Sequence, residues 1–597
     1  MAVNVDAVVI LVVFYLIILA VGLLAAYKVK VKGNELKRLE TSLVAGRDLK
    51  TSVGIFTMIA TTVGGGYING TAEEVARSGL VWTLAPLGIF IGLNLGGALF
   101  ARKMREGCYL TMLDPFQTHY GNLPTLLIYL ASLTGDLLWT ASILNALGST
   151  LSVIADIELT VAVVVSGSVT IAYTMAGSMI SVAYTDVVQM IFIVLGLVTS
   201  LPFVFSNDKI GSLSESKDTW LGSVPSSFRG LWADLLVAMT LGTIPWQAYF
   251  QRVLSMKSAR QAQMLSFVAA LGALVLAVPP VLLGIAGASA DWSNTTFGES
   301  PIGTDESNLI LPLVINEFTP SAVSLLGLGA ISAAVMSSMD SSILATSSMF
   351  THNIYHEMFR SKASPKELRV VQISAVIFFG CVAMGIAVWV SVIYGIFILA
   401  ADIVFVIIFP QLTAVLYLPS YVNTSGSIAG FFVGLVLRIG AGEPIIDLPA
   451  WIRFPFYSDE DGQLFPFRTV SMLLSFIAIV LVTALSKLDI WDRVLGSCCF
   501  CLDGGKWKHW SEKWLTGRRE NVSDSDIAQQ PCGIAHDCID GSEGDPDKMW
   551  ASLKETEREM RGGEGEGEST GRIWVKCKTS EEEVEMDSVQ GQFRRLP

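Results

Sequence analysis

The sequence predicts an all-α membrane protein that crosses the bilayer many times. Of its 597 residues, 52% are hydrophobic and only 16% are charged, and the mean hydropathy is +0.55. About a quarter of the residues of a soluble domain are usually charged, so this composition excludes a soluble protein. The hydrophobic residues also gather in long runs, and a helix needs roughly 20 such residues to cross a bilayer.

Thirteen apolar runs predict about 13 transmembrane helices. They begin near Ala7, Leu49, Val81, Leu123, Leu159, Tyr184, Leu231, Met264, Asn308, Val370, Ile396, Ser427 and Thr469. The first run is too long for the core of a signal peptide and is followed by basic residues, so we interpret it as a permanent span.

The charge of the connecting loops predicts how these helices are oriented. Basic clusters follow the first, third, seventh and ninth helices, beginning at Lys28, Arg102, Arg252 and Arg360. On the opposite side, the loop 289–307 has no Lys or Arg and the loop 441–466 is acidic. Because Lys and Arg concentrate in cytosolic loops, we predict an extracellular N-terminus and a cytosolic C-terminus. The sequon at Asn294 then lies outside the cell and is a predicted glycosylation site.

Helices and composition divide the chain into five predicted parts. These are the first helix (1–27), a group of five helices (48–204), a second group of five (230–420), two further helices (425–490) and a cytosolic tail (491–597). The tail is acidic and rich in Gly and Ser, cannot bury a core, and is predicted to be mostly disordered. Because each group has an odd number of spans, the second group begins on the opposite side of the membrane from the first. The two groups therefore have opposite topologies.

Two predicted helices, five apart in the order, are interrupted. Gly64, Gly65 and Gly66 lie inside the second helix, where glycine is a poor helix former. Pro245 lies inside the seventh helix, where it removes a backbone donor and bends the chain. Transporters bind their substrates at such breaks in matching positions of two repeats. The alternative interpretation is close packing of glycine-rich helix faces.

Polar residues of the ninth helix indicate a cation site. Ser337 and Ser338 lie there, and hydroxyl oxygens suit a hard ion such as sodium, although serines in membrane helices also bond their own backbone. Asp340 is a functional candidate because it is ionisable within the membrane, or else a paired residue at the cytosolic end of the helix. Trp139 and Trp246 could hold an organic cation on their ring faces, or could be packing residues.

These segments resemble the sodium/solute symporter family, and within it the high-affinity choline transporters. The most specific motifs are VGGGYINGTA (Val63–Ala72), TMLDPFQ (Thr111–Gln117), SVAYTDVVQ (Ser181–Gln189), IPWQAYFQRVLS (Ile244–Ser255) and the serine-rich stretch from Ala333. The resemblance covers most of residues 1–490. It implies a LeuT-like core of two inverted five-helix repeats, uptake of choline or a similar organic cation driven by sodium, and chloride dependence. It further implies a plasma-membrane glycoprotein that cycles through vesicles, forms homo-oligomers, binds trafficking proteins through its tail and serves neurotransmitter biosynthesis.

The resemblance also assigns site residues. Matching motif to motif implies a sodium site made of Ile59, Thr62, Ala334, Ser337 and Ser338. It implies an aromatic choline pocket at Trp139 and Trp246. Choline transporters have Trp at the position of Thr62 and Tyr at that of Ile89, and both positions would face the cation. Each lost cation–π contact costs up to about 2 kcal/mol, so the pocket is weakened for choline or serves another substrate.

Two alternatives follow. The chain could transport a different small polar solute, or it could act as a non-transporting sodium-dependent sensor or channel. An enzyme or a nucleic-acid-binding protein is not expected, because the sequence has no nucleotide-binding loop, metal-ligand cluster or catalytic triad that exceeds chance.

Overall fold

The computed structural model describes residues 43–175, 179–298, 300, 306–390 and 392–487, with three positions of the N-terminal segment and three short strands near the C-terminus. The chain divides into two compact units, residues 1–528 and 529–597, which we describe separately. The predicted first helix, apart from three isolated positions, and most of the predicted tail lie outside the described residues.

The first unit is helical in its described part. Its first half contains α3 (Thr51–Thr62), α4 (Gly65–Arg77), α5 (Ala85–Leu95), η3 (Gly96–Ala101), α6 (Arg102–Glu106), α7 (Asp114–Tyr120), α8 (Asn122–Ala155), α9 (Leu159–Thr174), α10 (Met179–Phe205) and α11 (Lys217–Leu221). Its second half contains α12 (Arg229–Gly242), α13 (Gln247–Leu254), α14 (Ala259–Ser289), α15 (Ile310–Phe318), α16 (Ser321–Met349), η7 (Phe350–Phe359), α17 (Pro365–Trp389), α18 (Ile393–Ile403), η8 (Val404–Ile408), α19 (Phe409–Tyr417), α20 (Thr424–Gly440) and α21 (Phe467–Lys487).

Shorter 3₁₀ turns connect several of these helices. They are η1 (Ala45–Arg47), η2 (Leu80–Trp82), η4 (Ser226–Phe228), η5 (Trp292–Asn294), η6 (Ser307–Leu309), η9 (Pro419–Tyr421) and η10 (Pro444–Ile446). The sequon residue Asn294 therefore lies in the connection between α14 and α15.

The second unit contains a small antiparallel sheet, within the tail that composition predicts to be mostly disordered. Its strands are β1 (Ile573–Lys576), β2 (Glu583–Asp587) and β3 (Gln592–Arg595), in the order β1-β2-β3. Trp574 pairs with Glu585, and Met586 pairs with Phe593.

Membrane-spanning helices dominate the described part of the first unit. Eight helices there are long and apolar enough to cross a bilayer, and the bent pair α3–α4 makes a ninth candidate. Every predicted span after the first corresponds to a helix or to a helix broken in two, although α9 and α20 are shorter. The all-helical membrane fold is therefore confirmed, whereas the number thirteen stays a prediction.

The predicted ninth span begins in the wrong place. It was expected to start near Asn308, but residues 310–318 form the separate short helix α15, and the long helix α16 begins at Ser321. Thr319 and Pro320 are both extended between them. A residue before proline avoids helical geometry, so the helix ends there despite the continuous apolar sequence.

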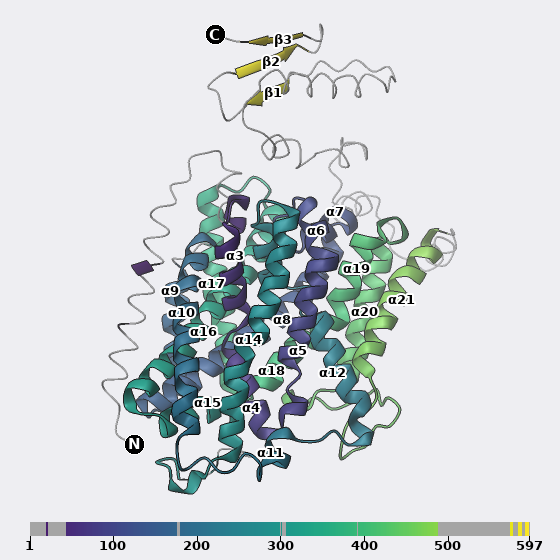
Figure 1. The fold of residues 1–597 in the computed structure, drawn as a ribbon. Coiled ribbons are helices and arrows are strands. Elements are labelled where there is room, and N and C mark those ends of the chain that lie inside the picture. Colours follow the sequence, from purple (N-terminus) through teal and green to yellow (C-terminus); the bar gives the residue numbers. More distant parts are fainter. Residues whose placement is uncertain are drawn as a thin grey trace. The chain divides into compact units, whose positions relative to one another are not determined.

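Helix α16 is one of the most buried helices of the first unit and lies near α9 and α10 in Figure 1. From Ala330 to Met349 it is buried on all sides, and it packs against α8, α10 and α17. The outer helices instead expose large apolar side chains, such as Ile191 on α10, Leu271 on α14 and Phe378 on α17. A polar core helix enclosed by helices with apolar outer faces is the arrangement that a bilayer requires.

Two helices are broken at matching places. Helix α3 ends at Thr62, Val63 and Gly64 are non-helical, and α4 continues at an angle of 46°. In the second half, α12 ends at Gly242 and α13 begins at Gln247 after a break around Pro245. The two pairs run in opposite directions, since α3 precedes α4 from the top of Figure 1 whereas α12 starts near the bottom. This arrangement agrees with the predicted inverted repeats.

Candidate substrate and cation sites

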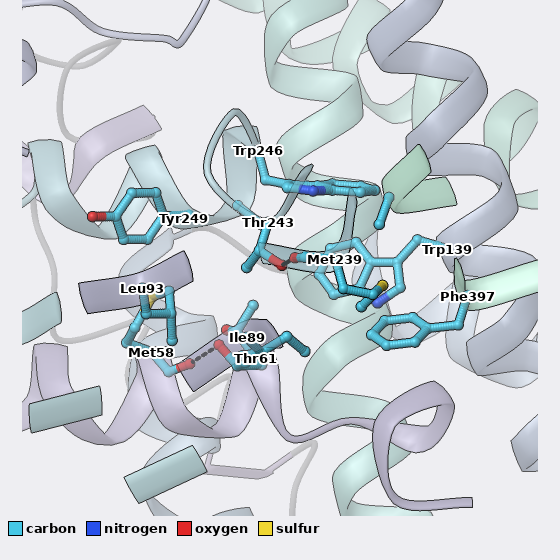
Figure 2. Close-up of a pocket in the computed structure, with 13 residues that line it drawn as sticks. Met58, Thr61, Ile89, Leu93, Trp139, Met239, Thr243, Trp246, Tyr249 and Phe397 are labelled. Atoms are coloured by element: carbon cyan, nitrogen blue, oxygen red, sulfur yellow. Dashed lines mark hydrogen bonds between the residues drawn. The ribbon is translucent and has the colours of Figure 1, made fainter. Parts of the chain in front are cut away.

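A cavity lies between the two helix breaks (Figure 2). Helices α3, α5, α8, α12, α13 and α18 contribute its lining, which consists of Met58, Thr61, Thr62, Ile89, Leu93, Trp139, Met239, Thr243, Trp246, Ala248, Tyr249, Phe397 and Ala401. The four residues that the sequence predicts to bind substrate, Thr62, Ile89, Trp139 and Trp246, all belong to this lining. None of the lining residues carries a charge.

Two tryptophans form one end of the cavity. Trp246 has an extended backbone in the break before α13, and its Nε1 donates a hydrogen bond of 2.6 Å to the Gly242 carbonyl. The ring centroids of Trp246 and Trp139 are 5.2 Å apart, with 69° between the ring planes. Phe397 of α18 lies beside Trp139 (Figure 2). Because the indole nitrogen of Trp246 is already bonded, this end offers mainly aromatic faces to a ligand.

The other end of the cavity combines aliphatic side chains, threonine hydroxyls and the ring of Tyr249 (Figure 2). Figure 2 shows Ile89, Thr61 and Met58 away from the tryptophans, at the end of α3 and on α5. The hydroxyl of Thr62 donates to the Met58 carbonyl at 2.8 Å, so its proton is used within the helix. No aromatic ring occupies the positions of Thr62 and Ile89. Tyr249 is the aromatic residue at this end, and its hydroxyl is bonded to Ser266 at 2.9 Å.

Two of the predicted sodium ligands, Ser338 and Ala334, lie where α16 passes the break after α3. The Ser338 hydroxyl donates to the carbonyls of Thr61 (3.1 Å) and Ala60 (3.3 Å). A Cβ atom on Gly64 would lie 1.8 Å from the Ser338 Oγ and 3.7 Å from the Ala334 carbonyl oxygen. Glycine at position 64 is therefore needed for this close approach of the two helices.

The remaining predicted sodium ligands have other contacts. Ile59 accepts a helix-ending hydrogen bond of 2.8 Å from the Val63 N–H, so one lone pair of its carbonyl is used. The Ser337 hydroxyl donates to Asp186 Oδ1 at 2.6 Å. Of the two neighbouring serines, Ser338 thus faces the break in α3 and Ser337 faces α10.

A buried ionic network beside this site was missed by sequence reasoning. Asp186 on α10 accepts from Ser337 and from Thr57, and its carboxylate lies 3.6 Å from the Arg252 guanidinium on α13. Arg252 also donates to the Ser341 hydroxyl at 2.5 Å. The network connects α3, α10, α13 and α16. An ionisable residue inside a predicted span was the signal, and both Asp186 and Arg252 lie inside motifs quoted above.

Asp340 lies elsewhere. It is buried in the middle of the span formed by α16 and η7, and it accepts a hydrogen bond of 2.5 Å from Thr174 on α9. Asp340 thus has a buried hydrogen-bond partner, as the alternative of a paired residue expected, whereas its depth in the membrane stays a prediction. It does not line the cavity.

Comparison with known proteins identifies the family. Residues 43–434 match the model of the sodium:solute symporter family, which covers more than half of the chain. The chain belongs to this family. It is also 45% identical to human high affinity choline transporter 1 over 519 residues, which cover 83% of this chain and 89% of the relative. The Drosophila melanogaster high-affinity choline transporter 1 is 46% identical over 488 residues, covering 81% of this chain and 79% of the relative.

A solved structure shares the fold. It is the substrate-bound, outward-open state of a Na⁺-coupled sialic acid symporter, with a TM-score of 0.63 and 17% identity, covering 80% of this chain and 98% of that one. At this identity the similarity concerns the fold alone. Family membership confirms that the chain is a multi-pass, sodium-coupled transporter and not an enzyme.

Proposed function

We propose that this sodium:solute symporter takes up choline or a choline-like organic cation by alternating access. The observation that carries the proposal is the pairing of Trp139 and Trp246 in an uncharged cavity at the helix breaks. A quaternary ammonium group has no N–H to donate, so ring faces are its natural partners. The choline transporters to which the chain is similar support the same substrate class.

The end of α3 links the cavity to the proposed sodium site. Thr62 lines the cavity with its side chain, and its backbone carbonyl is a proposed sodium ligand with Ile59, Ala334, Ser337 and Ser338. Sodium bound there would hold α16 against the end of α3 and so set the shape of the cavity. We therefore propose that sodium binding and substrate binding are coupled through the end of α3, which both ligands would contact.

A different small solute is the second candidate, favoured by Thr62 and Ile89. These residues put a hydroxyl and an aliphatic side chain at two positions where a choline pocket would have rings. A substrate with a cationic head and a larger or more polar body would fit this asymmetry.

The test is uptake of labelled choline and of a panel of quaternary and primary amines into cells that express the chain, with sodium and with sodium replaced. Sodium-dependent, saturable uptake of choline is expected. Sodium-dependent uptake of another solute alone would support the second candidate, and currents without saturable uptake would contradict transport. Replacing chloride with gluconate in the same assay tests the proposed chloride dependence, for which reduced uptake is expected.

One variant tests the pocket itself. Trp246→Ala should abolish uptake of any cationic substrate, because it removes the aromatic face at the break. Trp389→Ala is the matched control, since Trp389 on α17 is 69% exposed and far from the cavity lining. Unaltered uptake by Trp246→Ala would place the pocket elsewhere.

The cellular setting is also a proposal. We place the chain in the plasma membrane with its N-terminus outside, its C-terminus in the cytosol and a glycan on Asn294; vesicle cycling, homo-oligomers and trafficking partners of the tail complete the proposal. Glycosidase treatment should increase the electrophoretic mobility of the wild type but not of Asn294→Gln. An unchanged mobility of the wild type would contradict the orientation.

A further inference from the structure

Besides Asp186 and Asp340, a third buried carboxylate, that of Asp136, lies one helical turn from the cavity-lining residue Trp139. Asp136 is on α8, three residues before Trp139, and only 1% of its surface is exposed. Among the described residues, the Thr346 hydroxyl is the polar side-chain neighbour of its carboxylate, neither carboxylate oxygen has a hydrogen bond of normal geometry, and no cationic group lies within 4.0 Å. Asp186 differs in this respect, because Arg252 lies beside it.

Hydroxyl groups line the contact between α8 and α16 that contains this carboxylate. Thr346 of α16 lies beside it, and Thr140 and Ser342 form the next contact between the helices, 2.7 Å apart. Tyr129 lies two turns before Asp136 on α8, and its hydroxyl is also buried without a hydrogen-bond partner among the described residues.

The protons of the surrounding threonines are already used. Thr140 donates to the Asp136 carbonyl at 2.7 Å, and Thr346 donates to the Ser342 carbonyl at 3.0 Å. With the Thr140 proton committed, the Ser342 hydroxyl is the donor in the pair with Thr140. These three hydroxyls therefore keep lone pairs available for a ligand, along the helix contact that also contains Asp136.

A buried, ionised carboxylate without a partner costs several kcal/mol. The group must therefore bind a proton or another cation. Oxygen lone pairs around a carboxylate are the ligands that hard metal cations take. A proton on the carboxyl group would donate one hydrogen bond, whereas three hydroxyl oxygens here have lone pairs available to accept one.

We propose that Asp136 and the hydroxyls of Thr140, Ser342 and Thr346 form a separate sodium site between α8 and α16. The inference rests on the proposed function, since it adds a coupling ion to that transport cycle. Thr346 follows Ser338 by two helical turns along α16, so the site lies on the cytosolic side of the cavity in the proposed orientation. One more ion per cycle would increase the concentration gradient that transport can sustain.

Equilibrium binding of radioactive sodium to the purified full-length chain in lipid nanodiscs tests the site. Asp136→Asn keeps the shape of the side chain and removes its charge, and we expect it to bind one sodium ion fewer per chain than the wild type. Asp136→Glu should keep the ion. The midpoint of thermal unfolding should also rise less steeply with sodium concentration in Asp136→Asn, because a ligand stabilises only the state that binds it.

An equal number of bound ions in Asp136→Asn and the wild type would overturn the proposal, since the carboxyl would then carry a permanent proton. If Asp136→Asn does not fold, Thr346→Val keeps the carboxylate, and a sodium affinity weaker by about tenfold is expected. An unchanged affinity in Thr346→Val would contradict the site.

Ser338→Ala separates this inference from the proposed function. A loss of one ion in Ser338→Ala without any loss in Asp136→Asn contradicts the Asp136 site alone. A wild type that binds no sodium contradicts both.

Discussion

At the scale of single residues, substrate preference depends on which side chains reach the cavity. Trp139 and Trp246 supply aromatic faces at one end, whereas Thr62 and Ile89 lie where rings would complete an aromatic enclosure. A desolvated cation–π contact contributes up to about 2 kcal/mol. Having Thr62 and Ile89 in place of two aromatic residues should therefore lower the affinity of the cavity for choline.

Restoring the rings should strengthen choline binding. Thr62→Trp combined with Ile89→Tyr adds two cation–π partners, and we expect choline affinity to rise by tenfold or more, since roughly 1.4 kcal/mol is tenfold. Competition between choline and a labelled substrate measures the change. Leu87→Tyr is the control, because Leu87 is on the same helix but 43% exposed. Unchanged affinity in the double variant would mean that the cavity is shaped for another solute.

At the scale of helices, close contacts hold the broken elements together. The contact of Gly64 with Ser338 joins the end of α3 to α16, and the Asp114 carboxylate joins α7 to η7. Asp114 begins α7, where it accepts hydrogen bonds from the N–H of Leu110 (2.7 Å) and from Asn353 of η7 (2.7 Å).

A side chain at position 64 should separate α3 from α16. Gly64→Ala places Cβ 1.8 Å from the Ser338 Oγ, and overpacking of this kind costs about 1–3 kcal/mol. We expect a lower midpoint of thermal unfolding and a weaker sodium dependence of uptake. Gly329→Ala on α16 is the control, since a Cβ there meets nothing within 4 Å. Equal stability and sodium dependence in both variants would contradict the contact.

The contact between α7 and η7 should depend on pH. Burial raises the pKa of the Asp114 carboxyl, but His352 beside it and hydrogen bonds from Leu110 and Thr111 outweigh burial and lower the pKa from 3.8 to about 2. A lowered pKa stabilises the fold above the pKa of the unfolded chain, and this contribution is lost as pH falls from about 4 to about 2.

Asp114→Asn tests this contribution. The variant should be less stable than the wild type by about 2 kcal/mol at neutral pH. Thermal unfolding at a series of pH values measures the difference, which should be constant down to about pH 5 and shrink below pH 4. A difference that is the same at pH 3 and pH 7 would show that the charge of Asp114 is not the cause.

At the scale of the whole molecule, buried ion pairs attach the last two helices to the repeats. Arg438 on α20 pairs with Asp402 on α18 (2.8 Å) and with Glu443 (2.5 Å). Arg468 at the start of α21 pairs with the same Asp402 at 2.7 Å, and its backbone N–H donates to Asp234 of α12. Helix α18 is thus linked through charges to both α20 and α21, and α12 is linked to α21.

Removing one of these charges should destabilise the whole unit. Arg438→Met leaves Asp402 and Glu443 with less compensation in a buried place, and breaking a buried pair costs about 3–5 kcal/mol. The midpoint of thermal unfolding of the purified chain measures this loss. Arg453→Met is the control, because the Arg453 side chain is 62% exposed and should contribute little. Equal midpoints would mean that the network does not hold the helices together.

Features that depend on short stretches of sequence could be predicted. Apolar runs are as long as a bilayer is thick, so the spans follow from hydropathy alone. Glycine and proline act on the backbone at their own positions, which is why the breaks near Gly64 and Pro245 are visible in the sequence. The start of α16 could not be read from hydropathy, because Pro320 ends a helix without interrupting the apolar run.

Only the tertiary structure decided which polar groups meet. Ser337 and Ser338 are neighbours in sequence, but a helix turns by about 100° per residue, so one faces Asp186 and the other the break in α3. The sequence alone determined that this protein is a broken-helix membrane transporter with hydroxyls and aromatics in its core. Tertiary packing decided that Asp186 has a counter-charge whereas Asp136 has none among the residues that the structure describes, because charge balance in a membrane depends on neighbours that are distant along the chain.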